Sequence, residues 1–119
     1  MDNTNYNTLK LDVEIKMELW SKDMINKSKN FSKFERETLI NPMMNEILIL
    51  LGELKRGRYI KQVRLEAWKN AQLAYFKLDS LLLLMYECRY INEGFYHHME
   101  YGLSEIGKMI TGLFSSLKK

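Results

Sequence analysis

Residues 63–89, VRLEAWKNAQLAYFKLDSLLLLMYECR, contain the pattern that decides the fold. Apolar residues recur there every three or four positions, which is the spacing of one face of an α-helix. This first stripe consists of Ala67, Ala71, Ala74, Leu78, Leu81, Met85 and Cys88. Its small members predict close helix packing at one end, and its cysteine is expected to be a small buried hydrophobe. The segment is therefore expected to be a central helix of a bundle.

A second apolar stripe adjoins the first and makes the apolar arc wider than a surface helix needs. It consists of Trp68, Tyr75, Phe76, Leu82, Leu83, Tyr86 and Tyr90. The four successive leucines 81–84 point to all sides of a helix and cannot all face three partner helices. We therefore expect a homo-oligomer whose interface includes Phe76, Leu82, Leu83, Tyr86 and Tyr90. The alternative is that the arc is simply the centre of one bundle.

Three further segments, about 6–27, 33–56 and 95–117, show the same period. Their apolar positions are Leu9, Val13, Met17, Trp20 and Met24, then Ile40, Met43, Ile47, Leu50 and Leu54, and then Met99, Leu103, Ile106, Ile110, Leu113 and Leu117. Short polar breaks join the four segments, with no second-domain linker. The sequence therefore predicts one all-α domain over residues 1–119, an antiparallel up-down-up-down four-helix bundle.

Three residues bear on the ends of the second helix. Ser32 and Glu35 have capping-box spacing, which favours a helix start near residue 33. Gly57 is expected to end this helix in the left-handed conformation. Pro42 lies well inside the pattern, so either the helix kinks there or a first piece ends at Ile40 and restarts.

Composition and cysteine usage favour a cytoplasmic protein that does not span a membrane. The single cysteine cannot form an intramolecular disulfide, and the first residues lack a basic stretch followed by an apolar one. The longest uninterrupted apolar run, Leu81 to Tyr86, is far shorter than the roughly 20 residues of a membrane-spanning helix.

Motifs for catalysis, metal binding or cofactor binding are not found, so neither an enzyme nor a metal or cofactor site is expected. His97 and His98 are adjacent and point about 100° apart on a helix, which prevents them from chelating one metal. Arg89 and His97 are farther apart than the catalytic pair of small helical ribonucleases. Asp79 could be a buried functional acid, although a solvated position or a salt bridge is the ordinary interpretation.

The segment KRGRYIKQVR, residues 55–64, places five cations and one tyrosine within ten residues and contains no acid. Such a loop suits phosphate contacts together with stacking on an unpaired base; the alternative is a solvated basic loop. Lys108, Lys118 and Lys119 add charge to the last helix. The predicted nucleic-acid-binding residues are Lys55, Arg56, Arg58, Tyr59, Lys61 and Arg64, continued by Lys69 and Lys77 along the next helix.

The chain resembles a superfamily of four-helix bundles that joins the ribosomal-RNA intervening-sequence proteins to the accessory variability proteins of diversity-generating retroelements. The segments that carry the resemblance are ERETL at 35–39, GRY at 57–59 followed by a lysine, and EIGKMITGLFSSLK at 105–118. Intervening-sequence proteins usually carry a segment like SIPSNIAEG in the second helix. This chain has LINPMMNEILILLGELKRGRY there, which is similar to the accessory variability branch.

The resemblance implies a homopentameric barrel of bundles that does no chemistry itself. It implies binding of RNA or an RNA/DNA hybrid, and association with a reverse transcriptase during mutagenic copying of a template RNA. Only the GRY segment and its basic neighbours match positions that would contact nucleic acid. The alternatives are an intervening-sequence protein, or a protein-interaction module that does not touch nucleic acid.

Overall fold

The computed structural model describes residues 9–117, which form helices and short connections without any β-strand. This range contains four helical rods. Three of them are single helices, α1 (Asp12–Ser28), α4 (Arg64–Glu87) and α5 (Glu93–Leu117). The remaining rod is continuous and consists of α2 (Lys33–Glu35), a π-helical turn (Arg36–Ile40) and α3 (Asn41–Tyr59). A 3₁₀ turn, Lys61–Val63, precedes α4. The predicted all-α fold with four helices is confirmed.

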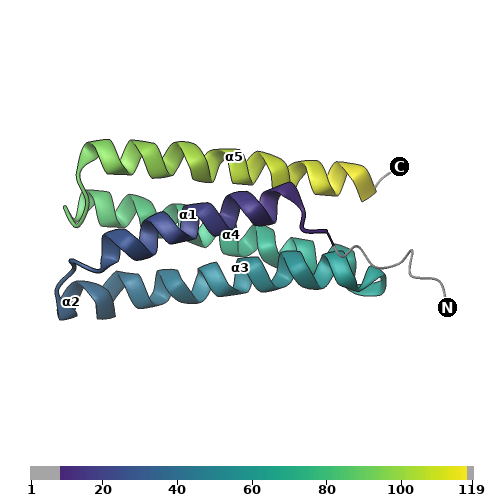
Figure 1. Cartoon of the computed structure of the whole chain (residues 1–119), viewed down its shortest axis with the longest axis horizontal. Coiled ribbons are helices and arrows are strands. Elements are labelled where there is room, and N and C mark those ends of the chain that lie inside the picture. The colour runs from purple at the N-terminus through teal and green to yellow at the C-terminus, as the bar shows by residue number, and fades with distance from the viewer. Residues whose placement is uncertain (1–8, 118–119) are drawn as a thin grey trace.

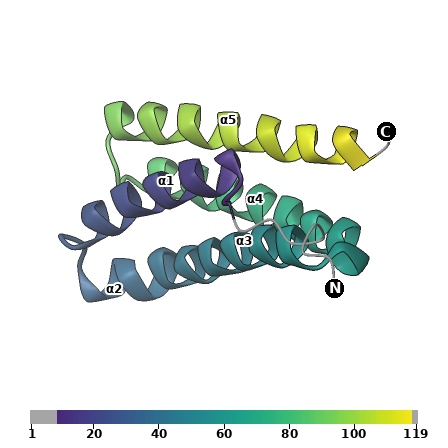
Figure 2. The same cartoon turned by 45° about the vertical axis from the view of Figure 1, so that its right-hand side comes forward.

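Each helical rod packs against two others. α3 and α5 lie on opposite sides, and α1 and α4 each pack against both of them (Figures 1 and 2). The connections from α1 to α2 and from α4 to α5 lie at one end of the bundle (Figure 1). The start of α1 lies at the other end, near the corner between α3 and α4.

The core is formed by the apolar stripes that the period of 3.6 predicts. The buried stripe members are Val13, Met17, Trp20, Met24, Ile40, Met43, Ile47, Leu50, Leu54, Ala67, Ala71, Ala74, Leu78, Met85, Met99, Leu103, Ile106 and Ile110. The Trp20 indole N–H donates to the carbonyl of Met99 at 2.9 Å, which ties α1 to α5. Cys88 and Leu9 are exposed, so the prediction that they are buried is wrong. Both residues lie beyond the ends of their helices.

The rod from Lys33 to Tyr59 passes Pro42 without a break, by means of a π-helical turn over Arg36–Ile40. The N–H of Asn41 donates to the carbonyl of Arg36, five residues back. Proline has no N–H to donate, and its ring crowds the preceding turn of a helix. One wider turn accommodates both the missing hydrogen bond and the crowding. The second predicted alternative agrees with these bounds, because the first piece ends at Ile40 and α3 starts at Asn41 with Pro42 in its first turn. The chain nevertheless stays helical across this junction.

Side-chain caps set the starts of two helices. Ser32 and Glu35 form the predicted capping box, with a Ser32 Oγ acceptor 3.2 Å from the Glu35 N–H and a reciprocal contact of 2.9 Å. α1 begins at Asp12 because Glu14 accepts a hydrogen bond from the N–H of Leu11, which is extended. The first helix was predicted to start near residue 6, and this is wrong for residues 9–11, which are not helical. Residues 6–8 lie outside the described range, as do Lys118 and Lys119.

Gly57 does not take the left-handed conformation, contrary to the prediction. It lies inside the last turn of α3, where a Cβ would come within 2.3 Å of the Trp68 indole nitrogen, so its small size is what the site requires. Arg89 has the left-handed φ of 66° instead and ends α4. The Tyr90 N–H then bonds to the Met85 carbonyl at 2.8 Å, the long bond of a Schellman motif.

Candidate functional site

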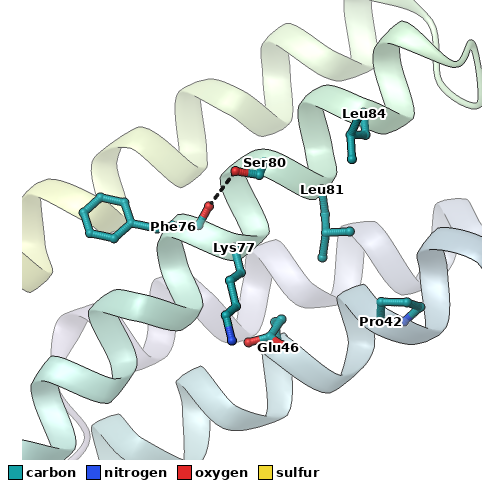
Figure 3. A pocket seen from close by; sticks show the side chains of 7 residues that line it. All are labelled: Pro42, Glu46, Phe76, Lys77, Ser80, Leu81 and Leu84. Atoms are coloured by element: carbon teal, nitrogen blue, oxygen red, sulfur yellow. Dashed lines mark hydrogen bonds between the residues drawn. The ribbon is translucent and has the colours of Figure 1, made fainter.

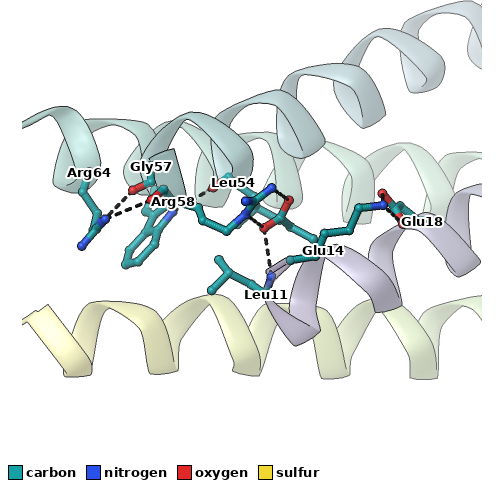
Figure 4. Close-up of polar contacts among 9 residues, drawn as sticks. Leu11, Glu14, Glu18, Leu54, Gly57, Arg58 and Arg64 are labelled. Atoms are coloured by element: carbon teal, nitrogen blue, oxygen red, sulfur yellow. Dashed lines mark hydrogen bonds and ion pairs between the residues drawn. The ribbon is translucent and has the colours of Figure 1, made fainter. Parts of the chain in front are cut away.

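The predicted basic segment forms the corner between α3 and α4, and its most buried cation is Arg58. The Arg58 Nε lies 2.6 Å from Oε2 of Glu14, and both side chains are almost fully buried, at 3% and 5% exposure (Figure 4). The Arg58 guanidinium also lies 4.4 Å from the centre of the Tyr59 ring. Hydrogen bonding to Glu14 raises the pKa of Arg58. The prediction that Arg58 contacts nucleic acid is wrong, because this side chain joins α1 to α3 inside the protein.

Arg56 is neutralised by acids from two helices. Its guanidinium lies 2.6 Å from Glu53 and 2.9 Å from Glu66, and Asn70 donates to Glu53 at 2.8 Å. The hydrogen bond from Arg56 lowers the pKa of Glu53, and the bonds to both acids raise the pKa of Arg56. A segment without acids in the sequence is therefore surrounded by acids in the fold.

Arg64 closes the corner by satisfying carbonyl groups at the end of α3. Its side chain donates to the carbonyl of Gly57 at 2.6 Å and to that of Arg58 at 3.1 Å (Figure 4). The guanidinium lies 5.5 Å from the centre of the Trp68 ring, and the Trp68 N–H donates to the Leu54 carbonyl at 3.3 Å. A cation at the carboxyl end of a helix is also favoured by the helix dipole. Arg64 therefore stabilises the fold through intramolecular contacts rather than contacting a ligand.

The four predicted lysines are exposed but do not form one patch. Lys55 lies 6.0 Å from the half-buried Tyr59 ring and lines a groove on the α1 side of α3. Lys77 lines a groove on the α4 side of the same helix and points toward Glu46 (Figure 3). Lys61 lies in the 3₁₀ turn and Lys69 on α4. The eight predicted residues therefore do not converge on a single nucleic-acid site.

The predicted oligomer interface is also divided by the fold. Phe76 and Leu83 are exposed, at 55% and 42%, whereas Leu82 is completely buried in the core. Assigning Leu82 to an interface is therefore wrong. Tyr86 stacks on Tyr96 with ring centres 4.5 Å apart, and Tyr90 packs edge-on against Phe31, so intramolecular contacts partly cover both tyrosines.

A wider apolar surface is open on α4, and only Phe76 and Leu83 of its residues belong to the predicted interface. Large apolar side chains with exposures of 42–55% follow the outward side of this helix, namely Leu65, Leu73, Phe76, Leu83 and Leu84. Successive members are eight, three, seven and one residues apart, which places all five within an arc of about 100° on one side of the helix. The helical spacing of these outward apolar residues is present in residues 63–89. It is difficult to recognise there because the buried stripe and the four successive leucines overlap with it.

A shallow groove of about 410 Å³ lies beside this surface, between α3 and α4 (Figure 3). Its lining is mainly carbon, with one acid and one lysine at the edge; the lining residues are Pro42, Glu46, Phe76, Lys77, Ser80, Leu81 and Leu84. An apolar groove with few charges fits an amphipathic segment of another protein better than a phosphate backbone.

The two histidines form surface pairs with acids rather than a reactive site. His97 lies 3.7 Å from Glu93, and His98 lies 3.7 Å from Asp23, with all four side chains largely exposed. Asp79 is exposed, so it is not a buried acid. Residues 9–117 contain no group of three or more potential metal ligands. In the same range, no helix combines the length and apolar character needed to cross a bilayer.

No family model, curated protein or solved structure matches the chain. Function is therefore inferred from the side chains of the described residues. These provide an apolar outer face on α4, a groove beside it, and a basic corner whose three arginines are held by internal contacts.

Proposed function

We propose that this chain is a non-catalytic accessory protein that works mainly by holding other proteins against the outside of its bundle. The observation that carries the proposal is the open apolar surface of α4 with its groove toward α3. Monomeric proteins rarely leave large contiguous apolar patches in water, and patches rimmed by polar groups are typical of protein-binding sites. The resemblance to accessory variability proteins supports a reverse transcriptase as one such partner.

Assembly with further copies of the chain is part of the proposal. Exposed leucines on α4 would be covered in an assembly, and most soluble oligomers consist of identical copies. The resemblance implies antiparallel bundles arranged as a ring of five in the cytoplasm. Repeating the outer face in an assembly would present several equivalent docking sites to one reverse transcriptase, which raises the effective concentration of each.

The groove provides the test of this function. Leu84 lines the groove and is 46% exposed, so Leu84→Ser removes apolar contact area without opening the core. The matched control is Leu48→Ser, a leucine on α3 that is 66% exposed and lies on the α1 side. A purified reverse transcriptase from a diversity-generating retroelement is expected to bind the wild type and the Leu48 variant, and to bind the Leu84 variant roughly fivefold more weakly. Absence of binding, or equal loss in both variants, would contradict the proposal.

Direct contact with RNA or an RNA/DNA hybrid is a second candidate, favoured by the exposed lysines that remain after the arginines are assigned to the fold. It predicts that replacing the four lysines by alanine abolishes a salt-dependent affinity for structured RNA. Replacing the buried Arg58 should leave that affinity unchanged in the folded protein. Binding that is insensitive to the four lysines would leave only protein contacts. The four are Lys55, Lys61, Lys69 and Lys77.

A further inference from the structure

The groove between α3 and α4 changes from apolar to charged along its length. At one end it is lined by Pro42 of α3 and Leu84 of α4. Further along, Glu46 of α3 and Lys77 of α4 extend toward each other from the two helices (Figure 3). Glu46 follows Pro42 by four residues, so the acid lies about 6 Å along α3, roughly one helical turn from the apolar end.

Beyond the charged pair the two helices become apolar again. Ile49 follows Glu46 by three residues on α3, and Leu73 precedes Lys77 by four residues on α4. These spacings keep both apolar residues on the groove side of their helices. Ile49 and Leu73 are 39% and 54% exposed. The groove and its extension therefore form an apolar, charged and apolar strip about 16 Å long between Leu73 and Leu84, which matches about three turns of a docked helix.

The two central charges lack partners among the described residues. Within residues 9–117 neither Glu46 nor Lys77 forms an ion pair. Glu53 lies two turns further along the same side of α3, and its own chain satisfies it, with Arg56 at 2.6 Å and Asn70 at 2.8 Å. Any segment that fills the groove removes water from Glu46 and Lys77. It must therefore offer a hydrogen-bond donor to the acid and an acceptor to the lysine.

A carboxamide side chain meets both requirements. Its C=O accepts from the Lys77 ammonium, and its NH₂ donates to the Glu46 carboxylate. A hydroxyl carries its donor and acceptor on one atom, whereas a carboxamide separates them on two atoms and so reaches both walls of the groove. A cation would be repelled by Lys77 and an anion by Glu46, and an apolar side chain would leave both charges without water or a partner.

We infer that the groove binds an amphipathic helix that carries a glutamine or asparagine between two apolar residues, each about one turn away. The apolar residues pack on the two apolar ends of the strip, and the carboxamide bridges Glu46 and Lys77. A single polar residue in an apolar helix contact fixes its register, because any shifted register leaves the polar groups unpaired. This inference rests on the proposed function, since it takes the reverse transcriptase as the protein that carries the helix.

The first experiment measures the binding of synthetic peptides to the full chain by fluorescence anisotropy. Four peptides of about 14 residues share leucines one helical turn to either side of a central position, and a lactam bridge on the opposite face keeps them helical. The central residue is glutamine, leucine, lysine or glutamate. The glutamine peptide is expected to bind roughly tenfold more tightly than each of the others. Equal affinity of the glutamine and leucine peptides, or no binding of the glutamine peptide, would overturn the inference.

The second experiment reverses the preference by changing the protein. The variant Glu46→Leu with Lys77→Met makes the whole strip apolar, so it should bind the leucine peptide roughly tenfold more tightly than the glutamine peptide. The matched control is Glu87→Leu with Lys69→Met, which removes the same two charge types from exposed positions of α4 outside the groove. Circular dichroism checks that both variants keep their helices. A glutamine preference that survives in the groove variant, or that disappears in the control, contradicts the inference.

The reverse-transcriptase assay separates failure of this inference from failure of the proposed function. If Leu84→Ser loses the enzyme while the peptides show no preference for glutamine, the inference is wrong and the proposed function stands. If the glutamine preference and its reversal are found while no reverse transcriptase binds, recognition by the groove stands and the accessory function is wrong.

Discussion

Replacing Arg58 by alanine is expected to destabilise the protein by about 3–5 kcal/mol, because it leaves the Glu14 carboxylate buried without its partner. Glu14 and Arg58 are 5% and 3% exposed, and they are joined by two hydrogen bonds of 2.6 and 3.2 Å. A domain of this size has about 5–15 kcal/mol of stability in total, so the variant should be close to unfolding.

The assay is equilibrium unfolding in urea, followed by the fluorescence of the two tryptophans. Lys61→Ala is the matched control, a cation three residues away that is exposed and should change the free energy of unfolding by at most about 0.5 kcal/mol. The double variant Glu14→Met with Arg58→Met removes both charges and fills the same volume. It should lose only about 1 kcal/mol, since the Leu11 N–H loses the Glu14 cap.

The outcome of this comparison decides whether Arg58 is structural. If Arg58→Ala were as stable as Lys61→Ala, the buried pair could not be what joins α1 to α3. If the double methionine variant were as unstable as Arg58→Ala, the loss would come from packing rather than from a stranded charge.

Three further predictions concern the corner and the helix ends. Gly57→Ala should lose about 1–3 kcal/mol in the same urea assay because its Cβ would meet a buried indole, whereas Gly52→Ala, with nothing within 4 Å, should gain about 0.5–1 kcal/mol; equal effects would contradict the close approach. Arg89→Gly should gain about 0.5–1 kcal/mol by relieving the left-handed φ of 66°, and a loss would mean that the side chain matters more than the backbone. Because Arg56 lowers the pKa of Glu53 from 4.5, this acid stabilises the fold above that pH and the contribution is lost as pH falls through the lower, folded value. Glu53→Gln should therefore flatten the acid side of a stability-against-pH curve, and an unchanged slope would count against the ion pair.

The helices and their buried faces were predictable because they follow from local periodicity. Met17, Leu50, Leu78 and Leu103 are each buried where a period of 3.6 places them. The residues of a helix that face the neighbouring helices are apolar, so they recur in the sequence at the helical spacing. Leu82 shows the limit of this signal, since in a run of four leucines the period cannot tell which ones the bundle will cover.

The site was less predictable because its decisive contacts join residues that are far apart in the sequence. Arg58 and Glu14 are 44 positions apart, and nothing near either residue indicates the other. The ten-residue window that looks purely basic takes its counter-charges from α1 and from both neighbouring helices. Charge patterns read along the chain therefore overestimated how much positive surface the fold exposes.

The residues that end helices were also predicted incorrectly, because tertiary packing determines these roles. Gly57 marks a close approach by Trp68 rather than a helix end, and Arg89 occupies the left-handed position that glycine usually fills. Residue identity restricts what a backbone can do, but neighbours decide which of the permitted roles is used.

The π-helical turn before Pro42 also bears on how this chain tolerates insertions and deletions during evolution. An ordinary helix turns by about 100° per residue, so one added residue would rotate everything after it away from the core. The wide turn at Arg36–Ile40 accommodates one residue more than an α-helical turn, and Met43, Ile47, Leu50 and Leu54 remain buried beyond it. Deleting one residue from this turn is therefore expected to leave the core positions on either side of it facing the same neighbours.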